Sequence, residues 1–408
     1  MNASDDRGDL LEALRSTPAA KRVLDALAAH QGVYLVGGAV RDLLLGGRPV
    51  DLDFVVEGDA APVATDLANR LGGTARAYEQ FGTASVSIGP ATYDLARART
   101  ETYAEPGALP VVSPAGLDAD LRRRDFTVNA IALAVAPPEP GRLTAAPLAL
   151  EDLAARRLRV LHDASFQDDP TRLMRLARYG ARLGFELEER TGRLAGEAVR
   201  SGALSTVSGP RVGQELRLAA READWFCCFA RLAELGLDAA IHPRFGLDRS
   251  LAEDALTFLP ADGRPDIVVL AAACRHLLPE EVSALLDRLG FDRAEAAPAR
   301  ALVGRLQQLA SALGAVRRAS EIDALLSGST PEEAALVAAL GPRAQACRWL
   351  GELRGVRLEI DGDDLRRAGI GEGPAVGAAL AAARAGRLDG ELMTREAQLE
   401  AALRIASQ

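Results

Sequence analysis

The sequence predicts an α+β protein, in which an α/β head over residues 1–160 precedes an all-helical remainder. Short apolar runs bounded by glycine and proline, which are typical of strands, occur before a break in the pattern near residue 136. From Leu148 onwards, apolar residues recur at helical spacing almost without interruption. Aromatic residues make up only 4% of the chain, and its wealth of Ala and Leu favours helices over a β-sandwich.

The head is expected to begin with a helix, because apolar residues from Leu10 to His30 follow an amphipathic pattern. Glycine and proline then separate short segments whose apolar spacing changes between the strand and helix periods. The expected order is helix 10–30, strand 33–36, helix 39–45, strand 50–56, helix 61–71, strands 84–88 and 91–96, a loop over 104–116 and an apolar run over 127–135.

Composition excludes several classes of protein. A chain of 408 residues is too long for one ordinary domain, and a net charge of -9 argues against a protein that coats nucleic acid indiscriminately. The four cysteines form no CxxC pair and no zinc spacing, which favours a reducing compartment. The acidic N-terminus lacks the apolar core of a secretory signal, and no apolar run reaches the ~18 residues that span a bilayer. We therefore expect a soluble, cytoplasmic protein with no membrane partner.

Two aspartates, Asp51 and Asp53, alternate with apolar residues along the predicted strand 50–56. Period two places both carboxylates on one face, with Leu52 and Phe54 on the other face towards the core. Neighbouring carboxylates repel each other unless a positive charge lies between them, and such oxygen donors suit Mg²⁺. Alternating acids are also common on solvated strand faces, so the pattern alone leaves both interpretations open.

A glycine turn precedes this pair. Gly37 and Gly38 follow the strand 33–36 and open a helix that carries Arg41. Glycines there let backbone N–H groups approach a phosphate, and Arg41 is placed to reach a triphosphate oxygen. The alternative is a plain strand-to-helix turn or a Rossmann variant, but the third glycine of GxGxxG is missing. The glycine turn, the arginine and the paired acids together predict a site that binds a triphosphate and a metal ion.

Asp94 is a candidate third acid. It lies on the predicted strand 91–96, which we expect beside the strand of Asp51 and Asp53. A solvent-facing aspartate with no function explains Asp94 equally well.

Several ordered segments carry a family resemblance: VGGAVRDLLLG with DLDFVV, then DLRRRDFTVNAIAL, then DDPTRLMRLARYGARLGF. They resemble the bacterial (class II) CCA-adding tRNA nucleotidyltransferases, a family that includes eubacterial poly(A) polymerases and enzymes adding only CC or only A. The resemblance implies a polymerase-β-like nucleotidyltransferase head with a mixed sheet, followed by an all-helical neck, body and tail. The expected bounds are 1–160 for the head, 161–222 for the neck, and 223–408 for the body and tail.

The resemblance also implies roles for individual residues. Asp51 and Asp53 match the family's Mg²⁺ ligands, and Asp94 matches a third catalytic carboxylate. An aspartate at position 125 can accept from a ribose hydroxyl, which distinguishes a ribonucleotide from a deoxyribonucleotide. The residues that match nucleotide-binding positions are Gly37, Gly38, Arg41, Arg124, Asp125, Asp169, Arg172, Arg175 and Arg178.

Asp169 and Arg172 provide a chemical reason for base selection. Cytosine and adenine both present an amino donor beside a ring-nitrogen acceptor, which a carboxylate and a guanidinium complement, whereas uracil and guanine present the reverse pattern. Asp169 followed by Pro170 is also an ordinary helix start, and the arginines after it would form a solvated helix face. Because the arginines directly follow the aspartate, we favour base reading.

The expected reaction is template-independent addition of CCA to the 3′ end of tRNA from CTP and ATP, with Mg²⁺ and release of pyrophosphate. The expected partner is tRNA, held at its acceptor stem and TΨC arm by the helical body and tail, and not DNA. Addition of only CC, addition of only A, and poly(A) synthesis stay open as alternatives. A non-catalytic RNA-binding module is the alternative of another class, against which the intact Asp51, Asp53 and Arg41 argue.

Overall fold

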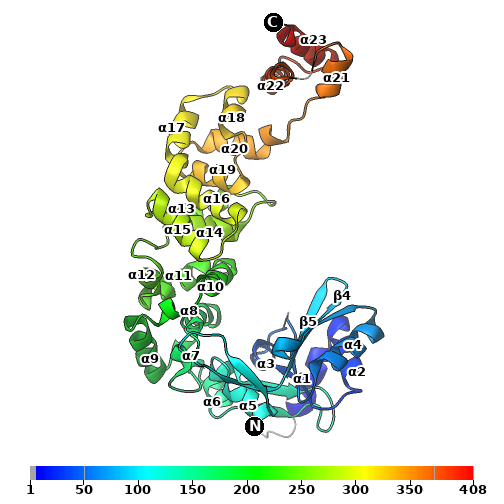
Figure 1. The fold of residues 1–408 in the computed structure, drawn as a ribbon, viewed down its shortest axis with the longest axis vertical. Helices are drawn as coiled ribbons and strands as arrows, with labels where there is room; N and C mark the ends of the chain where they lie inside the picture. The colour runs from blue at the N-terminus through cyan, green and yellow to red at the C-terminus, as the bar shows by residue number, and fades with distance from the viewer. Residues whose placement is uncertain (1–5, 50, 372, 408) are drawn as a thin grey trace. The chain divides into compact units, whose positions relative to one another are not determined.

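The structure is a computed structural model that describes residues 6–49, 51–371 and 373–407. The chain forms two compact units: unit 1 comprises residues 1–208 with 234–240, and unit 2 comprises 209–233 with 241–408. The predicted α+β class is confirmed, because unit 1 holds a mixed sheet with its helices and the rest of the described chain is helical (Figure 1). The expected division into head, neck, and body with tail stays a prediction.

Over the described residues, the main sheet of unit 1 has seven strands in the order β3-β4-β5-β2-β1-β8-β9. β2 and β5 run parallel, and the other neighbours are antiparallel. The strands are β1 (Val33–Val36), β2 (Asp53–Val56), β3 (Thr74–Tyr78), β4 (Thr83–Ile88), β5 (Ala91–Arg97), β8 (Ile131–Ala134) and β9 (Leu143–Ala145). Two further pairs are β6 (Arg99–Thr102) with β7 (Val111–Pro114), and β10 (Arg157–Leu158) with β11 (Glu186–Leu187).

The two faces of the sheet differ because side chains alternate along each strand. Helix α4 (Ala60–Leu71) packs on one face of β3, β4 and β5 (Figure 1). Val86 and Leu95 are buried on that side, and Phe54 is buried as predicted. The opposite face carries polar side chains, among them Asp53 and Asp94, which are exposed. This alternation leaves the acids on an open face, supported from behind by an apolar core.

The remaining helices of unit 1 are short. They are α1 (Asp6–Arg15), α2 (Pro18–Leu27), α3 (Gly38–Leu44), α5 (Leu117–Arg122), α6 (Ala149–Ala154), α7 (Ser165–Asp168), α8 (Thr171–Leu183) and α9 (Glu189–Arg200). The predicted single helix over 10–30 is wrong. The Thr17 side chain accepts a hydrogen bond from the Ala20 backbone N–H, and Pro18 occupies the first helical position of α2. These are helix-start signals, so the chain stops one helix and begins another.

Three other differences concern strands. The predicted strand 50–56 begins only at Asp53, with Asp51 in a bend, while Val50 lies outside the described residues. Strand β3 was not predicted, because all five of its residues are exposed and show no apolar alternation. The predicted loop over 104–116 is wrong in its second half, where β7 pairs with β6. Pro114 ends β7, a position at the edge of a two-stranded sheet where a missing N–H is tolerated.

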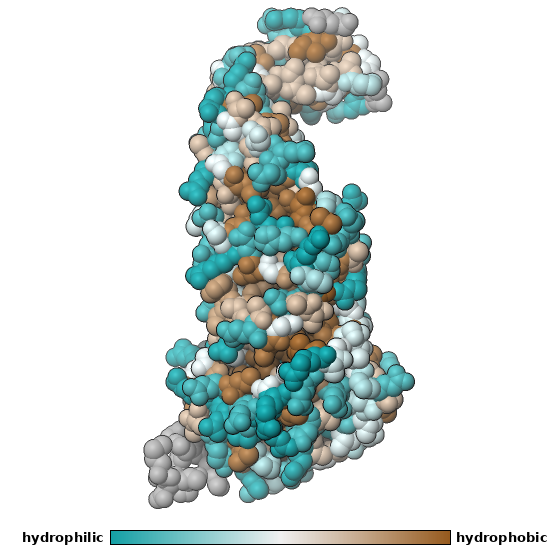
Figure 2. Space-filling view, turned by 90° about the vertical axis from the view of Figure 1, so that its left-hand side faces the viewer, coloured by the Kyte–Doolittle hydropathy of each residue, from teal (hydrophilic) through white to brown (hydrophobic). Residues whose placement is uncertain are grey.

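The helices after residue 208 are α10 (Gly209–Arg221), α11 (Trp225–Glu234), α12 (Leu237–Ile241), α13 (Arg249–Phe258), α14 (Pro265–Ala273), α15 (Pro279–Arg288), α16 (Arg293–Ala301), α17 (Gln307–Ala315), α18 (Ala319–Leu326), α19 (Pro331–Ala339), α20 (Arg343–Gly351), α21 (Gly362–Arg367), α22 (Pro374–Leu388) and α23 (Arg395–Ala406). Helix α14 is buried from Asp266 to Ala273, as expected of a helix in the core of unit 2. On the face drawn in Figure 2, hydrophilic residues surround smaller hydrophobic areas. None of the helices described has both the length and the apolar character needed to cross a membrane.

Unit 2 also uses its arginines for internal contacts. Asp323 on α18 accepts hydrogen bonds from the Trp349 indole of α20 at 3.0 Å and from Arg384 of α22 at 2.9 and 3.0 Å. Asp323 and Arg384 therefore hold α18, α20 and α22 together. Of the four cysteines, Cys228 and Cys274 are buried and Cys347 is exposed.

Candidate active site

A polar cleft of about 310 Å³ lies in unit 1, where the β1–α3 turn, β2, β6 and α8 meet. It gathers eight of the predicted site residues, namely Gly37, Gly38, Asp53, Arg124, Asp125, Asp169, Arg172 and Arg175. Its other lining residues are Glu101, Tyr103, Arg123, Asn129 and Tyr179. Residues that are up to 142 positions apart in the sequence, from Gly37 to Tyr179, thus line one cleft. The predicted residues Arg41, Asp51, Asp94 and Arg178 do not line this cleft.

The acids lie side by side on the open face of the sheet. Asp53 on β2 pairs directly with Asp94 on β5 in parallel register, which confirms the expected position of the Asp94 strand. The Ser85 hydroxyl of β4 donates a hydrogen bond to the Asp94 carboxylate. Asp51, just before β2, lines a second cavity of about 690 Å³. Burial, the Asp94 charge and the Asp51 charge together raise the pKa of Asp53, and Arg124 only partly offsets them.

This raised pKa is an electrostatic argument for a cation. The Asp53 carboxylate, whose ionisation is disfavoured by its surroundings, gains stability when a divalent ion lies beside it. Their oxygens form the hard donor set that Mg²⁺ prefers. Among the described residues, however, no group of three His, Cys, Asp or Glu side chains is already gathered closely enough to hold a metal. The donor chemistry therefore fits Mg²⁺, and the ion itself would have to draw the acids together.

The glycine turn lines the same cleft as Asp53. Gly37 has a φ of +69°, a conformation that favours glycine, and its N–H donates to the Ile131 carbonyl at 3.2 Å. A Cβ at this position would lie 3.2 Å from Nη1 of Arg124. Arg124 is held from behind by Asp120, to which its Nη2 donates at 2.9 Å. Gly37 is therefore the residue that lets the Arg124 guanidinium lie against the backbone in the cleft.

The Arg41 side chain is 1% exposed and does not line the cleft. Its contact with a triphosphate stays a prediction. Its Nη1 donates to Asn129 at 2.6 Å, and its Nε and Nη2 donate to Asp42 at 2.9 and 2.7 Å. Asn129 in turn donates to Asp125 at 3.0 Å. In this structure Arg41 positions the glycine turn against the 125–129 segment.

We expect Arg41→Met to destabilise unit 1, since it would leave Asn129 and Asp42 without their donor. Breaking a buried pair costs about 3–5 kcal/mol, and the partial exposure of Asp42 places this one near the lower limit. The midpoint of thermal unfolding should then fall by roughly 10 °C, with exposed Arg48→Ala as the unchanged control. An unchanged midpoint with a raised KM for the nucleotide would instead support direct contact with the triphosphate.

Asp125 is 7% exposed and lies at the centre of the cleft wall. It accepts from the backbone N–H of Phe126 at 2.8 Å, from Asn129, and from Nε of Arg175 at 2.8 Å. Burial alone would raise the pKa of this carboxyl, but the Arg175 charge, the Asn129 hydrogen bond and Arg172 outweigh it and lower the pKa. Asp125 is thus held ionised and immobile, as a group that accepts from a ligand hydroxyl requires.

Asp169 and Arg172 lie at the start of α8, as the sequence predicts. Oδ1 of Asp169 accepts from the Thr171 backbone N–H at 3.0 Å and from its hydroxyl at 2.6 Å. The predicted start with Asp169 as N-cap and Pro170 as the first helical residue is wrong by one position, because α8 begins at Thr171 with Pro170 as its N-cap. Arg172 is 5% exposed; its Nη1 donates to the Ser165 hydroxyl at 2.8 Å and its Nη2 to the Arg123 carbonyl at 2.7 Å. Both side chains are therefore held in place by hydrogen bonds. Arg172 does not belong to a solvated helix face, which was the alternative interpretation.

Tyr179, one helical turn after Arg175, was missed by the sequence analysis. Its hydroxyl accepts from Nη2 of Arg175 at 3.2 Å. The guanidinium carbons of Arg178, Arg41 and Arg175 lie 4.8, 5.6 and 5.6 Å from its ring centroid. A ring face attracts cations, so Tyr179 gathers three arginines at the wall of the cleft. Arg178 is 7% exposed and lies among them, and its contact with a nucleotide stays a prediction.

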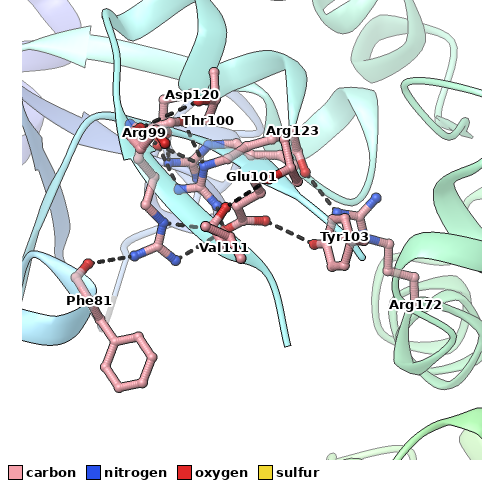
Figure 3. Close-up of polar contacts among 12 residues, drawn as sticks. Phe81, Arg99, Thr100, Glu101, Tyr103, Val111, Asp120, Arg123 and Arg172 are labelled. Carbon is pink, nitrogen blue, oxygen red and sulfur yellow. Dashed lines mark hydrogen bonds and ion pairs between the residues drawn. The ribbon is translucent and has the colours of Figure 1, made fainter. Parts of the chain in front are cut away.

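Glu101 and Tyr103 were also missed, and Figure 3 shows how they join the hairpin β6–β7 to the cleft. Oε1 of Glu101 accepts from Nη1 of Arg123 at 2.7 Å and from Nη2 of Arg99 at 3.0 Å. The Tyr103 hydroxyl donates to Oε2 of Glu101 at 2.9 Å; burial and the Glu101 charge raise the pKa of Tyr103 to about 12. Period two along residues 99–103 places these side chains on one face, which is the signal that could have found them.

The arrangement suits transfer of a phosphorylated nucleotide. Backbone glycines and Arg124 offer donors to phosphates, and Asp125 offers an acceptor to a sugar hydroxyl. Asp53 and Asp94 supply oxygen ligands on the adjoining strands. Asp169 and Arg172 offer an acceptor and a donor to the edge of a base. Each part of a nucleoside triphosphate thus finds complementary chemistry in one cleft.

Comparisons with known proteins agree with this chemistry. Residues 33–159 match the family described as the poly A polymerase head domain. An A-adding tRNA nucleotidyltransferase of Geobacter sulfurreducens is 34% identical over 400 residues, which cover 92% of this chain and 45% of that protein. A CC-adding tRNA nucleotidyltransferase of Deinococcus radiodurans is 36% identical over 264 residues, covering 62% of this chain and 69% of that protein.

Among solved structures, that of the Thermotoga maritima CCA-adding enzyme complexed with tRNA_CCA has a TM-score of 0.70 at 29% identity. The likeness covers 97% of this chain and 98% of that one. The chain spans about half, or less, of the length of the first curated relatives it matches.

Proposed function

This chain belongs to the tRNA nucleotidyltransferase family, and from that premise we propose that it adds CCA to the 3′ end of tRNA, using CTP and ATP and releasing pyrophosphate. The reaction attaches the α-phosphate of the incoming nucleotide to the 3′ hydroxyl of the RNA. Pyrophosphate leaves as that bond forms. The proposed location of this reaction is the cytoplasm.

One observation carries the proposal: the cleft is lined by Asp53, whose strand partner is Asp94, together with Asp169 and Arg172. The acids supply the chemistry that every nucleotidyl transfer needs. The Asp169–Arg172 pair supplies base selection without a nucleic-acid template, because a carboxylate acceptor beside a guanidinium donor complements cytosine and adenine alike. A binding module would need the second feature but not the first.

The proposed division of labour follows from the positions of the side chains. Asp51, Asp53 and Asp94 would hold Mg²⁺, and the bound ion would supply activation of the attacking hydroxyl and stabilisation of the leaving pyrophosphate. Gly37, Gly38 and Arg124 bind the triphosphate, and Asp125 accepts from the ribose. Arg175 keeps the Asp125 carboxylate in place, since its Nε and Nη2 both lie within 2.8 Å of Oδ2. Arg41 acts as a positioning residue behind them.

The helical part of the chain supports tRNA as the partner. The Thermotoga maritima enzyme was solved in a complex with tRNA_CCA, and the likeness to it extends over nearly the whole of both chains. We propose that the helices after residue 208 bind the acceptor stem and TΨC arm, mainly through backbone contacts that read shape and weaken with salt.

A second candidate is addition of the terminal A alone. It is favoured by the Geobacter sulfurreducens relative, which is an A-adding enzyme and is aligned over 92% of this chain. The geometry of Asp169 and Arg172 is compatible with both functions, because adenine and cytosine present the same donor–acceptor order on the edge concerned.

Three tRNA transcripts separate these candidates: one ending at the discriminator base, one at C and one at CC. Each is incubated with the purified chain and Mg²⁺, with CTP, ATP, UTP and GTP offered separately and together. CCA addition predicts that all three reach one fixed length with CTP and ATP, as read by sequencing gel. Growth of the CC transcript alone would identify A addition, and tails of unlimited length would identify poly(A) synthesis. No growth on any transcript would contradict the proposed activity.

A further inference from the structure

The open face of the sheet continues beyond the acids to the edge strand β3. Asp53 pairs with Asp94, Asp94 with Ser85, and Ser85 with Arg76 on β3. Directly paired residues point to the same face of a sheet, so the Arg76 side chain lies on the face that carries Asp53 and Asp94. Neighbouring strands are about 4.8 Å apart, which places the Arg76 backbone about 10 Å from that of Asp94. Arg76 therefore ends the row of side chains that begins at the acids.

An exposed aromatic ring accompanies this arginine. Tyr78 lies two residues further along β3, hence on the same face, and is 40% exposed. The Arg76 guanidinium carbon is 5.1 Å from the centroid of the Tyr78 ring. Arg76 forms no ion pair with a carboxylate in the part of the chain that the structure describes. A cation and a ring of this kind form the unit by which proteins bind single-stranded nucleic acid.

The turn between β3 and β4 is connected to the nucleotide cleft by hydrogen bonds. Phe81, on the turn between β3 and β4, is 44% exposed, and Figure 3 shows its ring turned away from the polar network. The Phe81 carbonyl accepts from Nη1 of Arg99 at 3.0 Å, and the other guanidinium nitrogens of Arg99 donate to Glu101 in the cleft wall. Phe81 is thus linked through Arg99 to Glu101, which lines the nucleotide cleft.

A charged residue on an edge strand also has a protective explanation, since it discourages pairing with another chain. That explanation accounts for Arg76 but not for Tyr78 and Phe81, because exposed rings promote association. Nor does it account for the register that aligns Arg76 with Asp53 and Asp94. A ligand that carries both negative charge and flat rings accounts for all three observations.

We propose that Arg76 and Tyr78 bind the 3′-terminal segment of the RNA that is being extended, a subsite that rests on the proposed nucleotidyl transfer. A terminal base stacks on the Tyr78 ring, and the Arg76 guanidinium contacts a phosphate of the same strand. The row from Arg76 to Asp94 is short enough for one extended strand to reach both, so its 3′ hydroxyl lies at the acids. Stacking on a ring tolerates every base, as an RNA end whose last nucleotide changes during synthesis requires.

Steady-state kinetics on an RNA minihelix ending in CC, with ATP and Mg²⁺, test the subsite. Tyr78→Ala should raise the KM for the minihelix about tenfold, whereas Tyr78→Phe, which keeps the ring, should stay close to the parent protein. Arg76→Ala should also raise this KM and should reduce the slope of log KM against log salt by about 0.7. The KM for ATP should not change in any variant. Arg22→Ala, which removes an exposed arginine of α2, is the charge-matched control.

An unchanged KM for the minihelix in Tyr78→Ala, or a loss that appears in the KM for ATP instead, would overturn the subsite. Failure of the parent protein to extend any RNA would contradict the proposed function rather than this inference. A second readout covers that case: 2-aminopurine at the 3′ terminus of the minihelix should be quenched on binding to the parent protein and to Tyr78→Phe, but not to Tyr78→Ala. Equal quenching in all three proteins would reject stacking at Tyr78.

Discussion

Asp53→Asn should lower the rate of nucleotide incorporation roughly a thousandfold, since it removes a Mg²⁺ ligand at the centre of the proposed reaction. Asp53 is the acid that lines the nucleotide cleft and the one whose pKa is raised by burial, by Asp94 and by Asp51. Binding of tRNA should change little, because the contacts proposed for its acceptor stem and TΨC arm lie after residue 208 and do not use this carboxylate. Single-turnover incorporation and a gel-shift assay, made on the same protein samples, measure the two quantities.

The same substitution has an opposite expected effect on stability. A carboxyl group whose pKa is raised in the folded state holds its proton more tightly there than in the unfolded chain. At neutral pH the ionised Asp53 therefore destabilises the fold, so Asp53→Asn should unfold at a higher temperature than the parent protein in the absence of metal. Below the pKa of an unfolded aspartate this difference should vanish, since both states are then protonated.

Added Mg²⁺ should raise the unfolding temperature of the parent protein and not that of Asp53→Asn. Asp25→Asn, which neutralises an exposed aspartate of α2, is the control for a simple change of net charge. Full incorporation by Asp53→Asn, or an equal Mg²⁺ response in both proteins, would contradict the metal assignment. The two readouts are independent, because the thermal shift requires no turnover.

The second large effect concerns base selection. Asp169→Asn should lower kcat/KM for both CTP and ATP by about 10- to 100-fold and reduce the preference over UTP and GTP. The amide offers one acceptor and one donor group where the carboxylate offers acceptors only, so it no longer rejects a base carbonyl. An Asn side-chain oxygen can also accept from the Thr171 backbone N–H and hydroxyl, so these hydrogen bonds can be kept. The substitution therefore separates base reading from support of the start of α8.

Arg182→Ala is the matched control, because Arg182 belongs to the same helix but is exposed and does not line the cleft. Incorporation is measured with each of the four nucleotides on transcripts ending at the discriminator base and at CC. If Asp169→Asn lowers thermal stability while selectivity is unchanged, Asp169 only supports the start of α8. If selectivity alone changes, Asp169 reads the base.

Comparison of the sequence with the structure separates two kinds of information. Local patterns were sufficient for the strand Val33–Val36, the helix Ala60–Leu71 and the outward direction of Asp53, because periodicity and glycine turns act over a few residues. They were insufficient for β3, whose residues are all exposed, and for the hairpin β6–β7, whose pairing depends on contacts across a connection. Ordered motifs carried the family resemblance and hence the expectation of a mixed sheet.

The sequence by itself determined that this chain carries a glycine turn, paired acids and an Asp–Arg helix start, since each motif is written within a few consecutive residues. Only the tertiary structure decided how they combine. It buried Arg41 against Asn129 and Asp42, set Asp94 in register with Asp53, and brought Glu101 and Tyr103 to the cleft. The physical reason is that burial, strand register and long-range hydrogen bonds depend on residues far apart in the chain, which local periodicity cannot relate.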